Sequence, residues 1–480
     1  MERVTNQKNI TTNIIYNILN QIVSLIVPLI LSPYVARVLS PELIGDYSYA
    51  LANSSYFVLI ESLGFSLYGM LKVAANRDDR NYISMLFKEI MLAKIVMMFL
   101  CTTVYSIVFL RILNSDKWLC LIMSLNIISS GIDSTWFLSG MEDFKTTTLR
   151  NVFVRIINVI LVIVFVKSEQ DFRLYAWIMQ ASNAISYLIV FPTVKKYTIP
   201  VKISVNHIFE HTKKSMAYFI PGLVNTIFSS ADKTVLGAFA NNYEVGVYEQ
   251  SSKICTMCGT VINSISNVIL PRVTYLNKTK SAGEAKAFLF KTIRGAIVIS
   301  VAVTVGIISI ANEFVPFFFG QGYEESVCLL KILAVNVLMS VVANYMGQQC
   351  LISVGKQHEY NIAISVGAGI NLLINILLVN EMQAVGVCVA SVISSVVVFV
   401  MVLIYSKSKI LFNDIFAMSW KPIIAAVIMW LGVSKIYLDN KVVFLIVKVT
   451  FGILIYFAVL FILKEDFLIQ MIHKLKNRNN

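Results

Sequence analysis

Long apolar runs separated by short charged breaks make up most of this chain. One bilayer crossing needs roughly 20 mainly apolar residues, and a backbone inside lipid must form its hydrogen bonds within its own segment. The runs therefore predict membrane-spanning helices and no sheet. Fourteen runs qualify, and they cover residues 13–33, 43–70, 84–110, 116–138, 147–166, 174–194, 215–239, 246–271, 292–315, 326–352, 359–379, 383–406, 418–437 and 442–463.

Lysine and arginine are distributed unevenly over the breaks. If the N-terminus is cytoplasmic, 27 of the 40 lysines and arginines lie in or beside loops on that side, seven lie on the other side, and six fall within spans. Cytoplasmic loops of membrane proteins carry such an excess of positive charge. We therefore expect both termini to face the cytoplasm. A count of thirteen spans or fewer would reverse part of this topology.

The composition excludes several classes of protein. Only 14% of residues are charged and 57% are hydrophobic, whereas a soluble domain usually carries about 25% charged residues. The net charge is +13, but the basic residues lie in short loops beside apolar runs, so we expect no nucleic-acid partner. The loops are too short for a soluble catalytic domain, and the chain has neither a nucleotide-binding loop nor a zinc-protease motif. We expect no enzymatic activity, no cofactor and no bound metal.

Two short sequence patterns recur about six spans apart. Because six is even, such repeats keep the same orientation in the membrane, and parallel repeats are typical of transporters that hold substrate between two halves. Chance similarity between apolar segments is the alternative. The repeats predict a six-helix lobe at 1–205, a second at 206–408, and two additional helices with a basic tail at 409–480. The repeated stretches are Leu43–Tyr47 with Glu244–Tyr248, and Leu138–Gly140 with Ser353–Gly355.

Polar residues form stripes on several predicted spans. The clearest stripe lies on span 246–271, where steps of three and four residues place six polar side chains on one helical face. A polar face in a membrane must point to other helices or to a water-filled cavity. Hydrogen bonding between helices would explain any one stripe, but several together favour a hydrophilic lumen. The six residues are Glu249, Lys253, Thr256, Thr260, Asn263 and Asn267, and the first span carries a shorter stripe of Asn13, Asn17, Asn20 and Ser24.

Ionisable side chains within the spans are the sharpest candidates for function, because each costs roughly 2.5–3.5 kcal/mol at the centre of a membrane helix. Cations in a lumen would suit an anionic substrate such as a phosphate or pyrophosphate. A local Glu249–Lys253 ion pair and lysines or arginines that reach the headgroups from helix ends are the simpler explanations. The candidate substrate-binding residues are Lys94, Arg155, Lys253, Lys331, Thr256 and Asn263, and the candidate ion-coupling residues are Asp232, Glu249 and Glu61.

Three stretches of the chain, Pro33–Glu42, Trp136–Lys145 and Asp232–Tyr248, carry a family resemblance. They resemble bacterial oligosaccharide flippases of the Wzx type, and the resemblance follows segment order to about residue 405. It implies the fold of the multidrug, oligosaccharidyl-lipid and polysaccharide exporter superfamily. The expected architecture is an all-α polytopic membrane protein of about fourteen transmembrane helices, in two six-helix lobes around a central cavity plus two extra C-terminal helices.

The resemblance further implies a cargo and a location. The expected substrate is an oligosaccharide on undecaprenyl pyrophosphate, flipped by alternating access from the inner to the outer leaflet of the bacterial inner membrane, for O-antigen or capsule assembly. A polysaccharide polymerase and a chain-length regulator are further partners that this role implies. An ion-coupled multidrug or metabolite exporter of the same superfamily is the first alternative. A membrane polysaccharide polymerase ranks behind it, because such enzymes usually need a sizeable extramembrane loop.

Overall fold

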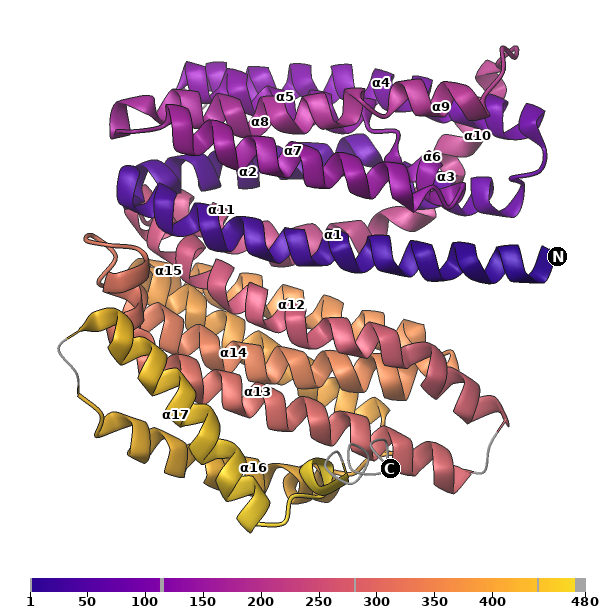
Figure 1. The fold of residues 1–480 in the computed structure, drawn as a ribbon. Coiled ribbons are helices and arrows are strands. Elements are labelled where there is room, and N and C mark those ends of the chain that lie inside the picture. The colour runs from indigo at the N-terminus through magenta and orange to yellow at the C-terminus, as the bar shows by residue number, and fades with distance from the viewer. Residues whose placement is uncertain (1, 113–115, 280–281, 438–439, 471–480) are drawn as a thin grey trace. The chain divides into compact units, whose positions relative to one another are not determined.

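The computed structural model describes residues 2–112, 116–279, 282–437 and 440–470. Over these ranges every regular element is a helix and no strand occurs, which confirms the predicted all-helical fold. The chain forms two compact units, Met1–Gly237 and Ala238–Asn480, called unit 1 and unit 2 below. Figure 1 colours unit 1 from indigo to magenta and unit 2 from rose to yellow.

Unit 1 is built from helices α1 to α11. Three of them begin after an aspartate whose carboxylate accepts a backbone N–H of the first turn, namely Asp79, Asp116 and Asp143. In this unit α2 packs on α4 and α5, α5 packs on α8, and α7 packs on α1 and α8. The helices are α1 (Glu2–Val38), α2 (Pro41–Ser62), α3 (Phe65–Ala75), α4 (Arg80–Ile107), α5 (Lys117–Ile132), α6 (Thr135–Gly140), α7 (Phe144–Phe165), α8 (Phe172–Leu188), α9 (Phe191–Tyr197), α10 (Val205–Ser215) and α11 (Phe219–Phe239).

Two predicted spans of unit 1 are broken in the middle. The chain bends by 42° between α2 and α3, where Leu63 and Gly64 both adopt positive φ. Between α5 and α6 the helix stops at Asp133, whose backbone is extended. The two short helices that follow these breaks, α3 and α6, pack against each other. Each break frees backbone groups that must find partners inside the protein.

The contact between α3 and α6 depends on the absence of a side chain at Gly69. A Cβ placed there would lie 2.5 Å from the ring of Trp136, which is itself buried. We predict that Gly69→Ala destabilises the protein by about 1–3 kcal/mol through overpacking. Gly369→Ala in α15 is the matched control, because a Cβ there meets nothing within 4 Å and alanine favours a helix. Thermal unfolding of the purified proteins should give a lower midpoint for Gly69→Ala alone, and equal midpoints would contradict the packing described here.

The described part of unit 2 contains six long helices, one of which is broken. Helix α14 packs against α12, α13 and α15, while α16 and α17 pack on each other and on α13 (Figure 1). Gln383 inside α15 has a φ of 47°, so two helices meet there across a kink. The helices are α12 (Asn242–Thr279), α13 (Ala282–Phe318), α14 (Ser326–Met346), α15 (Gln357–Tyr405), α16 (Phe412–Ser434) and α17 (Lys441–Ile462).

The described helices include many that are able to cross a bilayer. By length and apolar composition, 11 of them qualify, or up to 12 if the bent pair α2 and α3 counts as one span. This confirms a multi-pass membrane protein. The predicted total of fourteen exceeds the count of 12 for two reasons. The sequence predicts two spans, 359–379 and 383–406, where α15 with its kink at Gln383 counts once, and it predicts 215–239, which corresponds to α11 and is not among the 11. The total of fourteen stays a prediction.

Candidate functional site

Lys94 lies at the break between α5 and α6 in unit 1. Its ammonium group donates to the carbonyl of Ser130 at 2.8 Å and to the carbonyl of Asp133 at 3.1 Å. Only 1% of its surface is exposed. Those carbonyls stand where α5 ends and its helical hydrogen bonding stops. The geometry therefore gives Lys94 a structural role as a cap of a broken helix, and substrate binding by Lys94 stays a prediction.

Glu61 lies beside the same break. Its Oε2 accepts a hydrogen bond from the Ser130 hydroxyl at 2.6 Å, and the side chain is fully buried. Its Oε1 is buried and has no hydrogen-bond partner among the described residues. Ser130 thus joins Lys94 and Glu61 into one cluster, with the lysine on its carbonyl and the carboxylate on its hydroxyl. Ion coupling through Glu61 stays a prediction.

Arg155 belongs to a polar seam between α1 and α7. Its guanidinium donates to the Ser24 hydroxyl, and one turn earlier Asn151 donates to Asn20. Within the described ranges no carboxylate lies within 4.0 Å of Arg155, which is half-buried. Asn20 and Ser24 of the first predicted stripe therefore bond to a neighbouring helix. The side chains of the other two stripe residues, Asn13 and Asn17, lie outside the described part of the chain.

Arg150 is a second buried arginine on α7 that the sequence analysis missed. Its guanidinium donates to the carbonyl of Ser186 at 3.2 Å and to Asn151 at 2.5 Å, and it stacks 5.7 Å from the ring centre of Tyr187. Its Nε is buried without a partner among the described residues. The signal was present, because Arg150 lies inside the predicted span 147–166, but its place near the start of that span suggested a loop residue.

The stripe on α12 in unit 2 differs from the α1 seam in its accessibility. Lys253 and Glu249 form an ion pair at 3.4 Å, with 33% and 20% of their side chains exposed. Thr256 and Thr260, the next two members, are exposed. Asn263 is half-buried, and its Oδ1 has no hydrogen-bond partner in the described part of the chain. The last member, Asn267, accepts a hydrogen bond from the Gln348 side chain at 3.2 Å, so the exposed part of this face lies at Thr256 and Thr260.

Two further candidates lie on other helices. Lys331 of α14 is half-buried and donates to the side-chain oxygen of Asn312 on α13 at 2.8 Å. Asp232 is buried on α11, two residues before Thr234, whose hydroxyl lies 3.2 Å from the Tyr56 hydroxyl. The candidate acids are divided between the units, with Glu61 and Asp232 in unit 1 and Glu249 in unit 2.

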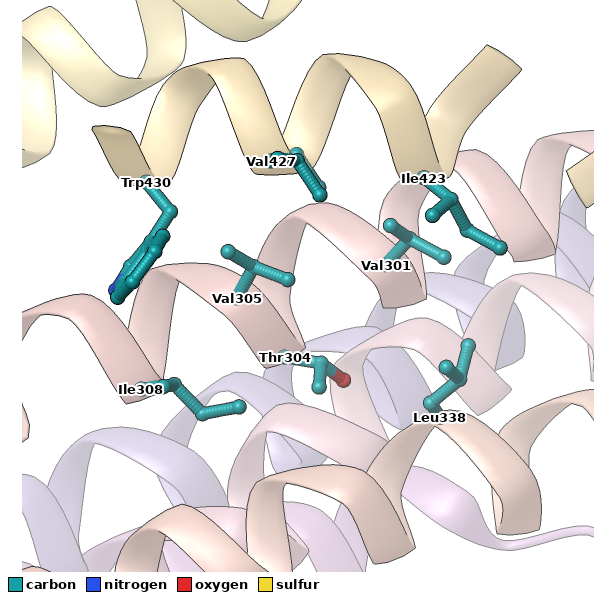
Figure 2. A pocket seen from close by; sticks show the side chains of 9 residues that line it. Val301, Thr304, Val305, Ile308, Leu338, Ile423, Val427 and Trp430 are labelled. Carbon is teal, nitrogen blue, oxygen red and sulfur yellow. The ribbon is translucent and has the colours of Figure 1, made fainter. Parts of the chain in front are cut away.

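An apolar pocket lies between α13 and α16 in unit 2. Figure 2 shows the side chains that line it, among them Val305 and Ile308 of α13 and Trp430 of α16. The single hydroxyl in the lining, that of Thr304, donates to the carbonyl of Ala334 at 2.9 Å and is not free to bind a ligand. This pocket suits a hydrocarbon chain and offers nothing to a sugar or a phosphate. Among the described residues no group of three or more metal-ligating side chains could hold an ion.

Comparison with known proteins places the chain in a family. The sequence profile of the polysaccharide biosynthesis protein family matches residues 10–277. The chain is 21% identical to a candidate O-antigen transporter of Escherichia coli strain K12 over 84% of this chain and 98% of that protein. It is also 21% identical to the capsular polysaccharide biosynthesis protein CapF of Staphylococcus aureus, over 76% of this chain and 91% of that protein.

The fold matches that of a solved transporter. The lipid II flippase MurJ, in an inward closed conformation, superposes with a TM-score of 0.74 over 95% of this chain and 99% of that one, at 15% identity. At this identity the likeness establishes the fold alone. The profile match, in contrast, covers more than half of the sequence and includes all three stretches that carried the resemblance. The chain belongs to the polysaccharide biosynthesis protein family of multi-pass membrane proteins.

Proposed function

We propose that this protein is a flippase for oligosaccharides linked to undecaprenyl pyrophosphate. In this proposal it moves them by alternating access from the inner to the outer leaflet of the bacterial inner membrane, for O-antigen or capsule assembly. Relatives of similar length are named for O-antigen transport and capsule biosynthesis, and the matching fold is that of a lipid II flippase. These names support the proposed class of cargo, a sugar carried on a lipid.

The accessible stripe on α12 carries the proposal. Exposing a lysine and two threonines to lipid along one helical face is unfavourable, whereas lining a water-filled passage with them is not. Threonine and asparagine side chains can hydrogen-bond sugars. Lys253, Arg155 and Lys331 supply positive charge for a pyrophosphate. The prenyl chain remains in the lipid outside the passage, because moving it through water would lose its hydrophobic contacts.

The topology completes the proposal. It has fourteen spans, both termini in the cytoplasm, lobes at 1–205 and 206–408, and two additional helices at 409–480. The excess of lysine and arginine on the proposed cytoplasmic side supports this arrangement. Asp232, Glu249 and Glu61 are the candidates for coupling transport to H⁺ or Na⁺. A polysaccharide polymerase and a chain-length regulator would act on the exported units.

Reconstitution tests the proposal directly. Purified protein in liposomes should move a fluorescent polyprenyl-pyrophosphate oligosaccharide between leaflets faster than protein-free liposomes do, as measured by quenching of the outer leaflet. Several short oligosaccharides should be tried, because the sequence does not specify the sugar. Transport of cationic drugs in the same liposomes, without movement of any lipid-linked oligosaccharide, would contradict the proposal and favour a drug exporter.

Arg155 gives a sharper prediction within that assay. Arg155→Ala should lower the flipping rate about tenfold, which corresponds to roughly 1.4 kcal/mol of lost interaction with the pyrophosphate. Arg155→Lys should retain part of the rate, because lysine keeps the charge but loses the bidentate geometry. Ser24→Ala is the matched control, since it removes the same hydrogen bond and keeps the guanidinium. If Arg155→Ala, Lys253→Ala and Lys331→Ala all flipped the substrate as fast as the unchanged protein at equal protein levels, the hypothesis of a cationic site would be wrong.

A further inference from the structure

Helix α10 is a short, two-faced helix that joins α9 to α11. Its 11 residues rise about 1.5 Å each, so it is far too short to cross a hydrocarbon core of about 30 Å. A three-residue turn, Met216–Tyr218, leads from α10 directly into α11. The helix therefore stays close to the start of α11. One face is buried at His211 and Ser215, and the opposite face is open.

The inner face is fixed to unit 1 through the buried Glu89 of α4. Its Oε1 lies 3.4 Å from His207 Nδ1 and accepts the backbone N–H of Ser204 at 3.0 Å. Its Oε2 lies 3.2 Å from His211 Nε2, and the Tyr68 hydroxyl of α3 lies 2.7 Å from the other ring nitrogen. Burial lowers the pKa of His211. A neutral ring with its proton on Nε2 faces the carboxylate and leaves Nδ1 to accept from Tyr68.

Close backbone packing fixes the same face at its C-terminal end. A Cβ on Gly64, at the break between α2 and α3, would lie only 2.5 Å from the carbonyl oxygen of Ser215. Gly64 has a φ of 76°, so glycine is favoured there on two grounds. With both ends of the inner face held, α10 cannot rotate to bury its outer face against unit 1.

The outer face is strongly apolar and exposed. Val205 and Phe209 of α10 lie on one side with Met216 of the turn that follows, and 67%, 74% and 56% of their surfaces are exposed. The segment 195–216, which contains α10, carries five lysines and one acid, Glu210, which is paired with Lys214. The segment 195–216 therefore carries a formal charge of +4. The five lysines are Lys195, Lys196, Lys202, Lys213 and Lys214.

We propose that α10 lies in the headgroup layer of the membrane, with Val205, Phe209 and Met216 at the acyl boundary and its lysines on anionic lipid headgroups. An apolar face bordered by lysines is the pattern of helices that lie in a bilayer interface. The segment also connects two helices of a membrane protein, so a bilayer surface is within its reach. The positive charge selects an anionic lipid surface over a neutral one. The Glu89 contacts set the rotation of the helix and aim the apolar face outward.

Spin labels on the full-length protein in nanodiscs test this proposal. Cys328→Ser removes the exposed native cysteine, and the remaining native cysteines are buried or half-buried. Val205→Cys and Phe209→Cys report on the apolar face, and Asn206→Cys and Glu210→Cys, both also exposed, are matched controls on the polar side. Collision with oxygen, which partitions into lipid, is compared with collision with a water-soluble nickel chelate.

The expected result is a periodic pattern that depends on lipid charge. In nanodiscs that contain phosphatidylglycerol, labels at 205 and 209 should collide several-fold more with oxygen relative to nickel than labels at 206 and 210. In nanodiscs of phosphatidylcholine alone, this difference between the two pairs of labels should be smaller. In the anionic nanodiscs, the combined substitution Lys202→Gln and Lys213→Gln should also make the difference smaller. Equal nickel access at all four positions would overturn the proposal in favour of a solvated helix. Low collision with both reagents at 205 and 209 would overturn it in favour of a face covered by protein.

Discussion

Lys94→Met is expected to destabilise the protein by roughly 3 kcal/mol or more and to reduce its yield. Lys94 is fully buried and holds the carbonyls of Ser130 and Asp133 at the break between α5 and α6. Methionine fills a similar volume but donates nothing. A buried acceptor left without a donor costs about 1–3 kcal/mol, and more for a charged group such as Glu61, which would lose its nearby cation. Thermal unfolding of the purified variant in detergent measures the effect.

A double variant separates the two sources of this loss. Lys94→Met combined with Glu61→Gln removes both charges of the cluster, and glutamine can still accept from the Ser130 hydroxyl. The double variant should recover part of the lost stability. If Lys94→Met instead unfolds at the original temperature while flipping falls, Lys94 acts on the substrate, and the role of helix cap is wrong. The single and double variants together therefore show whether Lys94 stabilises the fold or acts in transport.

The all-helical, multi-pass character of the chain was predictable from the sequence, whereas the helix breaks were not. Spans follow from the length of apolar runs, and these are local properties. The break at Asp133 lies inside an apolar run and is stabilised by Lys94, which is 36 residues away from Ser130 in the chain. Sequence reasoning therefore identified Lys94 as unusual because a charge in lipid is costly, but it could not identify the partner that offsets this cost.

Periodicity likewise found the polar stripes without showing what each one faces. Asn20 and Ser24 repeat at helical spacing, and they bond to Asn151 and Arg155 on α7. Thr256 and Thr260 repeat in the same way on α12, yet they remain exposed. The two stripes have similar spacing in the sequence and different surroundings in the fold. Only burial distinguishes a seam between helices from the wall of a passage, and burial depends on contacts far away in the sequence.

That distinction predicts large and opposite effects on transport within the α12 stripe. If Lys253 binds the pyrophosphate, Lys253→Gln should lower the flipping rate by about tenfold to a hundredfold, since each factor of ten corresponds to about 1.4 kcal/mol. Glu249→Gln should do the reverse and lower the concentration of substrate needed for half-maximal rate, because it frees Lys253 from its 3.4 Å partner. If the pair only stabilises α12, both variants should change the rate and the unfolding temperature alike.

Removing the hydroxyls of Thr256 and Thr260 on the same face should also lower the flipping rate. Thr256→Val with Thr260→Val keeps the side-chain volume and removes two hydrogen-bonding groups that are exposed, so the unfolding temperature should stay unchanged. Flipping of a lipid-linked oligosaccharide should fall, while Ile265→Val, an exposed position on the opposite face of α12, should leave it unchanged. If flipping fell in both the threonine double variant and Ile265→Val, the helix would tolerate no change. If it fell in neither, the sugar would pass elsewhere. Only a loss confined to the threonine face locates the passage along α12.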